Sequence, residues 1–263
     1  MMNRQLADMN RIQLKDIAPY SLAVLPTCSI EQHGTHLPLS TDGLLCNAVI
    51  AKAAGLASPG SSSRKEIILA PTLYYGDSHH HHPFPGVLSL TSSSYTRTVK
   101  EICEGISQSG FQRLAIINGH GGNESCNNIV IRELAYNYKN EMTISAISYW
   151  DIARTALLAE TNLSNRLIPG HAGQFETSLM LALRPDLVET TTIKKLKKGS
   201  DTTGGRYKEL PSHILDQVHV SGAWETGVGY TDNPSLSTAE AGHQYFEIIT
   251  RELAEFFIAL TAR

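Results

Sequence analysis

The sequence carries little charge and no excess of positive charge. Lys and Arg number 22 against 25 Asp and Glu, the net charge is -3, and charged residues make up 18% of the chain, below the roughly 25% of an average soluble domain. No run of adjacent cations exceeds two residues, as at Lys194-Lys195. Because nucleic-acid and anionic-membrane binders carry a basic face, neither class of partner is expected.

Long apolar runs, paired cysteines and nucleotide-binding motifs are also missing. No apolar stretch approaches the roughly 18 residues of a membrane span, and residues 1–17 lack the apolar core of a signal peptide, so the expected location is cytoplasmic. The absence of G-x-S-x-G, P-loop and G-x-G-x-x-G motifs disfavours serine hydrolases and nucleotide-cofactor enzymes. No C-x-x-C pair occurs, and buried free thiols are predicted at Cys28, Cys46, Cys103 and Cys126.

Short apolar runs alternate with helical patterns along the chain. Strands buried on both faces are predicted at residues 21–28, 66–70 and 113–118, and a fourth strand with a more alternating pattern is predicted at 142–149. Helices are predicted from residue 42 to 55, from Ser92 or Ser93 to Gly110, and at 123–135, 175–183 and 238–260. This alternation predicts an α/β fold, a three-layer α/β/α sandwich with a mostly parallel central sheet, in one domain over residues 1–263. The polar stretch 189–211 is predicted to be a surface excursion.

Histidines and carboxylates gather in three clusters, each close to a predicted strand end or helix start. The chain has 11 histidines. Because the carboxyl ends of parallel strands meet at one edge of a sheet, we expect the clusters to converge there. Carboxylate and imidazole ligands without thiolate suit zinc or manganese, and two metals about 3.5 to 4 Å apart need a bridging carboxylate. The candidate ligands are Glu31, His33, Asp42, His120 and Glu176.

Each cluster also has a plain structural interpretation. Asp42 alone is an ordinary helix N-cap, and Gly119–Gly122 alone is a tight turn. The four histidines at 79–82 form either a solvated loop or a wall with one or two side chains facing a substrate. Trp224 and residues 227–233 are candidates for either a lid or a subunit contact.

The same motifs resemble the creatininase (creatinine amidohydrolase) family in order and spacing. They are E-Q-H-G at 31–34, N-G-H-G-G-N at 118–123, H-A-G at 171–173 with E-T-S at 176–178, F-P-G at 84–86 and S-Y-W-D at 148–151. The resemblance implies an α/β/α hydrolase with two divalent metals, Zn and/or Mn, assembled as a hexamer that is a trimer of dimers. It also implies a small-molecule substrate.

The resemblance further implies a role for each matching residue. Glu31 and His120 would bind one metal and His33 the other, with Asp42 between them. His171 would relay a proton near the substrate, and Glu176 is a second catalytic candidate. The residues expected to contact the substrate are Ser78, Trp150 and Gly121.

Two departures from the family pattern affect these roles. Creatininase has Tyr and a metal-associated Glu where this chain has Gly121 and Gly122. The second metal therefore needs another carboxylate, for which Glu176 is preferred to Glu124. The Trp and Asp that close over creatinine also have no counterpart in residues 167–170, so creatinine itself is not the expected substrate.

The predicted function is hydrolysis of a C–N bond in a small cyclic amide by a metal-bridging hydroxide. A formamide, a peptide terminus or a ring C–C bond of a keto-inositol are alternative substrates for the same centre. A non-catalytic metal-binding protein is the alternative of another class, which the missing carboxylate at Gly122 favours. A Cys-His pair built on Cys28 is the mechanistic rival.

Overall fold

The computed structural model describes residues 4–57, 65–137, 142–164, 167–196, 199, 220, 222, 224–225 and 227–262. Its centre is a parallel sheet with the strand order β1-β3-β2-β4-β5. The strands are β1 (Arg4–Gln5), β2 (Leu22–Thr27), β3 (Ile67–Leu69), β4 (Arg113–Asn118) and β5 (Thr143–Ser148). The last four lie within the predicted ranges, and the two-residue β1 was not predicted.

Helices connect and cover the strands. They are α1 (Arg11–Ile17), α2 (Thr41–Ala57), α3 (Ser92–Gln108), α4 (Glu124–Asn137), α5 (Tyr149–Glu160), α6 (Gln174–Leu183), α7 (Thr190–Ile193) and α9 (Ala239–Thr261). The prediction that Ser92 or Ser93 caps α3 is wrong. Thr91 is the N-cap, because its side chain accepts a hydrogen bond from the Ser94 N–H.

The predicted surface excursion at 189–211 is only partly described. Its beginning is not irregular, because α7 forms a helical turn there that buries Ile193 against the core. Residues 197–198 and 200–211 lie outside the described residues.

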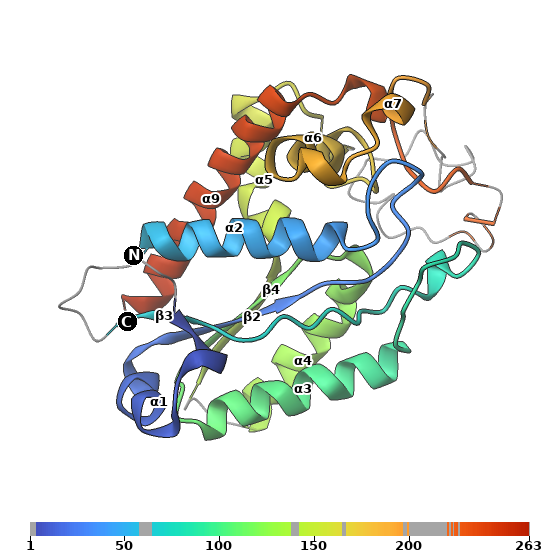
Figure 1. Cartoon of the computed structure of the whole chain (residues 1–263). Coiled ribbons are helices and arrows are strands. Elements are labelled where there is room, and N and C mark those ends of the chain that lie inside the picture. The colour runs from blue at the N-terminus through green and yellow to red at the C-terminus, as the bar shows by residue number, and fades with distance from the viewer. Residues whose placement is uncertain are drawn as a thin grey trace.

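Two hydrophobic clusters, one on each face of the sheet, make the three layers. Side chains on successive strand residues point to opposite faces, so Val24 packs under α2, α5, α6 and α9, while Leu25 packs under α1, α3 and α4. Figure 1 shows these two helix layers above and below the strands. The predicted α/β/α sandwich is confirmed.

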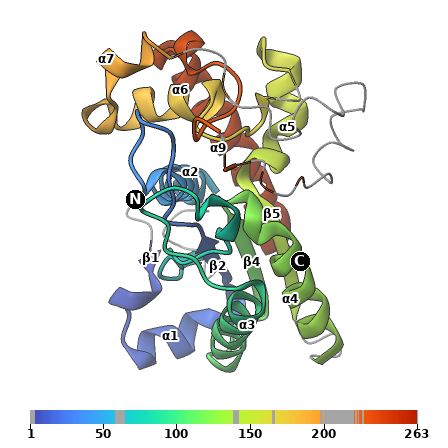
Figure 2. The ribbon, with the colours of Figure 1, turned by 90° about the vertical axis from the view of Figure 1, so that its right-hand side faces the viewer.

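The strand order creates a switch point between β2 and β4. From β2 the chain passes through α2 to β3 on one side, and from β4 it passes through α4 to β5 on the other. Loops leaving the carboxyl ends of such neighbours diverge and open a crevice, the usual place for a ligand in an open α/β sheet. This end of the sheet lies at the right of Figure 1 and faces the viewer in Figure 2.

The C-terminal helix α9 packs tightly against α6. Gly242 of α9 lies so close that a side chain there would collide with the carbonyl oxygen of Ser178. Glu176 lies two residues before Ser178 on the same helix. Close backbone contact with α9 therefore fixes the part of α6 that carries this candidate ligand.

Within the described part of the chain, no helix is both long and apolar enough to span a membrane.

Candidate metal centre

The structure brings the five candidate ligands together at the switch point. Glu31 and His33 lie in the loop after β2, Asp42 lies in the first turn of α2, His120 follows β4, and Glu176 lies in the first turn of α6. Each is at most 4% exposed. Three carboxylates and two imidazoles thus share one buried site, an arrangement that is unfavourable unless opposite charges compensate it.

Asp42 lies between two groups of ligands. Its Oδ1 lies 3.0 Å from Nε2 of His33, and its Oδ2 lies 3.2 Å from Nδ1 of His120. Glu31, Asp42 and His120 form one group able to hold a metal, and His33, Asp42 and Glu176 form another. One carboxylate with each oxygen directed at a different group is the geometry of a bridging ligand.

Backbone carbonyls orient both imidazoles. Nδ1 of His33 lies 3.2 Å from the Glu31 carbonyl oxygen, and Nε2 of His120 lies 3.0 Å from that of Asp77. Since a carbonyl only accepts, these nitrogens donate. The other nitrogen of each ring faces Asp42. Histidines that bind metals are held in this way, with the outer N–H donated to a carbonyl and the inner nitrogen directed at the ion.

The Glu176 carboxylate is held by the backbone just before α6. Its Oε2 accepts a hydrogen bond of 2.6 Å from the Ala172 N–H and lies 4.0 Å from Nε2 of His33. Ala172 has φ of +46°, a conformation that residues other than glycine rarely adopt. Strain of this kind persists where the surroundings impose it, as at functional sites.

His171 precedes α6, as predicted, and faces the first metal group. Its Nε2 lies 2.9 Å from the Gln32 carbonyl oxygen and 3.0 Å from the Gln32 side-chain Nε2. Its Nδ1 lies 3.6 Å from Oε1 of Glu31. Glu31, His33 and His171 form a third group of possible ligands, so His171 can either bind a metal or act beside one.

His81 is a site residue that the sequence did not single out. In the 3-10 turn His79–His81, only His81 is buried: it is 1% exposed, and its Nε2 lies 3.4 Å from Oε1 of Glu31. Ser78, predicted to contact the substrate, donates a hydrogen bond to Oε2 of Glu31. The histidine run was the only signal for this wall of the site, and the run does not show which of its members is buried.

Two asparagines also hold the site in place. Asn118 at the end of β4 donates 2.6 Å to the His120 carbonyl and accepts 3.2 Å from its N–H. Asn123 accepts a hydrogen bond of 2.9 Å from the Asp77 N–H. The N-G-H-G-G-N motif therefore brackets His120 with side chains that fix its backbone and that of its partner Asp77.

The structure gives a physical reason for the departure at Gly122. A side chain there would collide with the Asp77 carbonyl oxygen and would lie 2.6 Å from Nε2 of His120. The loop that carries Asp77 thus occupies the space that a glutamate would need, and Glu176 supplies a carboxylate to the second group instead. At Gly121 a side chain would meet nothing within 4 Å, so open space adjoins this predicted substrate contact.

The carboxylates and imidazoles shift the pKa values of one another. Burial alone would lower the pKa of His33, but the charges of Asp42, Glu176 and Glu31 outweigh burial and raise it to about 9. Burial, reinforced by Asp42 and Glu31 and opposed by His33, raises the pKa of Glu176 to about 8. Without metal, protons therefore take part in balancing the charge of this site.

The remaining members shift in the directions their neighbours dictate. Burial opposes ionisation of Glu31, but nearby imidazoles, His120 foremost, hold its pKa well below its usual range. Burial likewise opposes the charge on His120, yet Glu31 and Asp42 raise its pKa well above the usual value. Burial and the charge of His33 lower the pKa of His171 to about 3, so that ring is neutral at neutral pH.

The donor set fits divalent metal ions. Oε1 of Glu31, Nε2 of His33 and Oδ2 of Asp42 are buried and have no hydrogen-bond partner among the described residues. Leaving such atoms unpaired is costly, and all three belong to residues of the candidate metal groups. Carboxylate oxygens and imidazole nitrogens without thiolates suit zinc and manganese.

Trp150, a predicted substrate contact, and Glu124, the less preferred candidate ligand, lie outside the cluster of candidate ligands. Trp150 is 2% exposed and belongs to the hydrophobic core, with its ring centroid 4.9 Å from that of Tyr149. Glu124 accepts a hydrogen bond of 2.6 Å from Ser148 at the end of β5, and it belongs to none of the three candidate metal groups.

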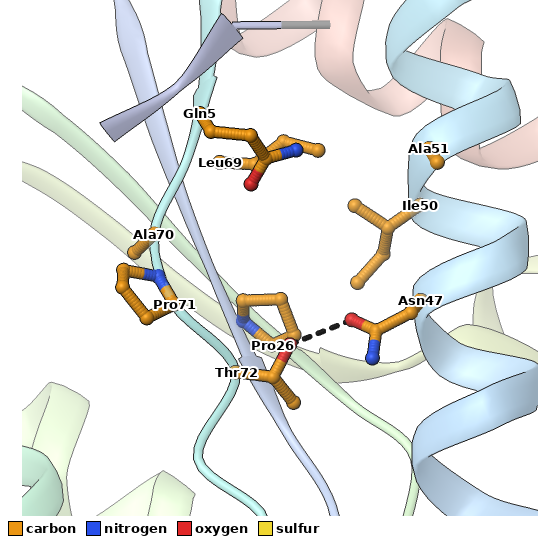
Figure 3. A pocket seen from close by; sticks show the side chains of 9 residues that line it. All are labelled: Gln5, Pro26, Asn47, Ile50, Ala51, Leu69, Ala70, Pro71 and Thr72. Atoms are coloured by element: carbon orange, nitrogen blue, oxygen red, sulfur yellow. Dashed lines mark hydrogen bonds between the residues drawn. The ribbon is translucent and has the colours of Figure 1, made fainter. Parts of the chain in front are cut away.

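A cavity of about 270 Å³ lies elsewhere, between α2 and the chain following β3. Figure 3 shows Asn47, Ile50 and Ala51 of α2 facing Leu69 and Thr72, with a hydrogen bond of 2.6 Å from Thr72 to Asn47. None of its nine lining residues is ionisable, so this cavity offers no acid, base or charged ligand.

Comparison with known proteins agrees with this geometry. A model of the family described as "Creatininase: Creatinine amidohydrolase" matches residues 7–257. The chain belongs to the creatininase family. As a member of that family it is an amidohydrolase.

Characterised relatives of this creatininase-family chain act on different substrates. A creatinine amidohydrolase from Pseudomonas putida is 33% identical over 65% of the chain and 67% of the relative. A mycofactocin precursor peptide peptidase from Mycolicibacterium smegmatis is 29% identical over 89% of the chain and 82% of the relative. These relatives do not determine the substrate of this chain.

Solved creatininase structures share the fold over nearly the whole chain. One creatinine amidohydrolase aligns with a TM-score of 0.74 at 26% identity, covering 97% of this chain and 96% of the other. Another, described as "Creatininase Mn", aligns with a TM-score of 0.72 at 25% identity and covers 97% of both chains.

Proposed function

We propose that this chain hydrolyses a C–N bond in a small amide at a binuclear centre of zinc, manganese or both. The orientation of the ligands carries the proposal: buried His33 and His120 donate their outer N–H to carbonyls and direct their inner nitrogens at a shared carboxylate. Buried carboxylate oxygens of Glu31 and Asp42 also lack a hydrogen bond among the described residues, and bound cations would compensate them.

In this proposal the ligands divide into two sets. Glu31 and His120 would hold one metal, His33 and Glu176 the other, and Asp42 would give one oxygen to each. Two bound cations would lower the pKa of a water between them towards about 7 and polarise the substrate carbonyl.

His171 handles the proton. Since its pKa is lowered to about 3, the ring is neutral at neutral pH, and the tautomer that donates Nε2–H to the Gln32 carbonyl would leave a free electron pair on Nδ1. Nδ1 would accept a proton at the cluster and pass it to the leaving nitrogen. Ser78 keeps the Glu31 carboxylate in position through its hydrogen bond to Oε2.

A small cyclic amide is the first candidate substrate, and a peptide is the second. The peptide is favoured by a specific observation, because the peptide peptidase matches 89% of the chain whereas the creatinine amidohydrolase matches 65%. A formamide and a keto-inositol stay alternatives. The hexamer implied by the resemblance and the cytoplasmic location expected from the sequence stay predictions.

The first test measures metal content by elemental mass spectrometry after chelation and reconstitution with zinc or manganese. About two ions per chain are expected in the wild type and fewer than about 0.5 in Asp42→Ala, because one residue serves both sites. Glu124→Gln is the matched control: it removes a carboxylate charge near the sheet edge but outside the metal groups, so two ions should remain.

The second test follows hydrolysis. Reconstituted protein is incubated with cyclic amides, formamides, short peptides and a keto-inositol, and release of amine or ring opening is measured by mass spectrometry. Turnover that requires metal and disappears in Asp42→Ala supports the proposal. A metal content near zero after reconstitution refutes it, and full metal without turnover of any of these substrates favours the non-catalytic alternative.

A further inference from the structure

Trp224 packs against two histidines of the candidate metal centre, although it lies far from both of them in the sequence. Its ring centroid lies 4.4 Å from that of His81 and 5.3 Å from that of His171, with interplanar angles of 63° and 81°. The two imidazoles stack on each other at 4.2 Å, and both face Oε1 of Glu31. The indole therefore contacts the two rings that border the first metal group.

Two residues that follow Trp224 in the chain form hydrogen bonds with the residues around the start of α6. Thr231 donates from its N–H to the His171 carbonyl and accepts from the His171 N–H through Oγ1, both at 2.8 Å. Asp232 accepts a hydrogen bond of 2.7 Å from the Gln174 N–H at the start of α6. Through these bonds, Thr231 and Asp232 hold their part of the chain against the loop that contains His171.

Trp224 makes a backbone hydrogen bond of its own, because its carbonyl accepts from the Gly227 N–H at 3.3 Å. It lies in a turn closed by a bond of 3.0 Å from the Glu225 N–H to the Gly222 carbonyl, and it is partly exposed. The five candidate ligands are at most 4% exposed, and the His171 side chain is 12% exposed. A substrate can reach these ligands only if a neighbouring side chain moves. Movement of the Trp224 indole breaks ring contacts, whereas movement of the residues at the strand ends would break backbone hydrogen bonds.

We propose that Trp224 is a substrate-contacting residue that gives way to the substrate and then packs its indole face against a planar group, an amide plane or an unsaturated ring. The inference rests on the proposed function, because it places the reacting bond at Glu31 and Asp42. Indole offers a large apolar face with an electron-rich surface, which favours flat partners over branched aliphatic ones.

The test uses two metal-chelating probes that share a head group. Acetohydroxamate carries only a methyl group, and benzohydroxamate carries a planar ring. Their dissociation constants are measured by calorimetry on the zinc-loaded full chain, for the wild type, Trp224→Ala and Trp224→Phe. Tyr136→Ala is the control, since Tyr136 is 83% exposed on α4. Metal content and circular dichroism are measured for each variant.

If Trp224 contacts the ring of the probe, removing its indole should weaken the binding of benzohydroxamate selectively. Benzohydroxamate should bind Trp224→Ala about tenfold more weakly, which corresponds to about 1.4 kcal/mol. It should bind Trp224→Phe within about threefold of the wild type, because the phenyl ring keeps an aromatic face. Acetohydroxamate should be unaffected by either substitution, and Tyr136→Ala should change neither constant.

A second readout uses the two tryptophans of the chain. Trp150 is 2% exposed, so acrylamide quenching reports mainly on Trp224. Benzohydroxamate should reduce quenching in the wild type and leave it unchanged in Trp224→Phe.

The failures are distinguishable. If Trp224→Ala weakens both hydroxamates equally, or weakens neither, the inference is wrong while the metal centre stands. If neither hydroxamate binds the zinc-loaded wild type, the proposed function itself fails and the inference fails with it.

Discussion

Metal loading should release protons, because the buried site stores them. With pKa values of about 9 and 8, His33 and Glu176 are protonated at pH 7 in the metal-free protein, and the raised pKa of His120 keeps that ring protonated too. Each group must lose its proton to bind a metal, so filling both sites should release about three protons at pH 7. At pH 9 the number should be smaller, since Glu176 is already ionised and His33 is half ionised.

Calorimetric titration of metal-free protein with zinc, repeated in buffers of different ionisation enthalpy, counts these protons. His33→Asn should lower the count by about one, and Glu124→Gln should leave it unchanged. The same protons set the stability of the metal-free protein. A pKa raised to about 9 from 6.5 means that the stability from His33 is present below pH 6.5 and is lost as the pH rises through 9. That loss is on the order of 3 kcal/mol.

Urea unfolding of metal-free protein at pH 6.5 and pH 9 measures that loss. Because the raised pKa of Glu176 adds a decline of the same sign up to about pH 8, the wild type should be clearly less stable at pH 9, and His33→Asn should decline less. Release of fewer than one proton at pH 7, together with equal stability at the two pH values, would show that the site is not proton-balanced and would refute this reasoning.

Three further outcomes are expected. His171→Ala should keep its metals, measured by mass spectrometry, and lose about 100-fold or more in turnover; full turnover would contradict its role as proton relay. Gly122→Ala should lose about 1 to 3 kcal/mol of unfolding free energy in urea, because its side chain would collide with the Asp77 carbonyl; wild-type stability would show that the loop yields freely. Chelation at pH 7.5 should lower the melting temperature by on the order of 10 °C relative to protein with metal at about 1,000 times its dissociation constant, and an unchanged temperature would show that metal does not bind the folded state preferentially.

The sequence predicts the sheet well where burial determines the pattern. Leu22–Thr27 and Arg113–Asn118 are central strands, so their apolar runs are continuous and recognisable. The two-residue β1 has no such pattern, and α5 follows β5 directly, without the loop that normally signals a new element. The sequence therefore predicts neither β1 nor α5.

The sequence identifies the five candidate ligands that the structure brings together, but it does not identify the aromatic rings beside them. Groups of charged residues at strand ends can be recognised in the sequence by residue type. The parallel topology then brings these strand ends together. Ring contacts do not follow from sequence: four adjacent histidines at 79–82 look alike, yet a 3-10 turn buries His81 alone. Trp224 reaches the same wall from a position 143 residues after His81, a distance that no local pattern encodes.

The contact between Gly242 and Ser178 makes the last helix part of the metal centre without giving it a ligand. Glu176 stays in place because α6 is pressed against α9, so the proposed binding of metal to Glu176 would be thermodynamically linked to docking of α9. Metal should therefore slow amide hydrogen exchange in α9, and loosening α9 should weaken metal binding. The C-terminal end of the chain, far from the ligands in sequence, is a place where affinity for metal can be tuned without touching the site.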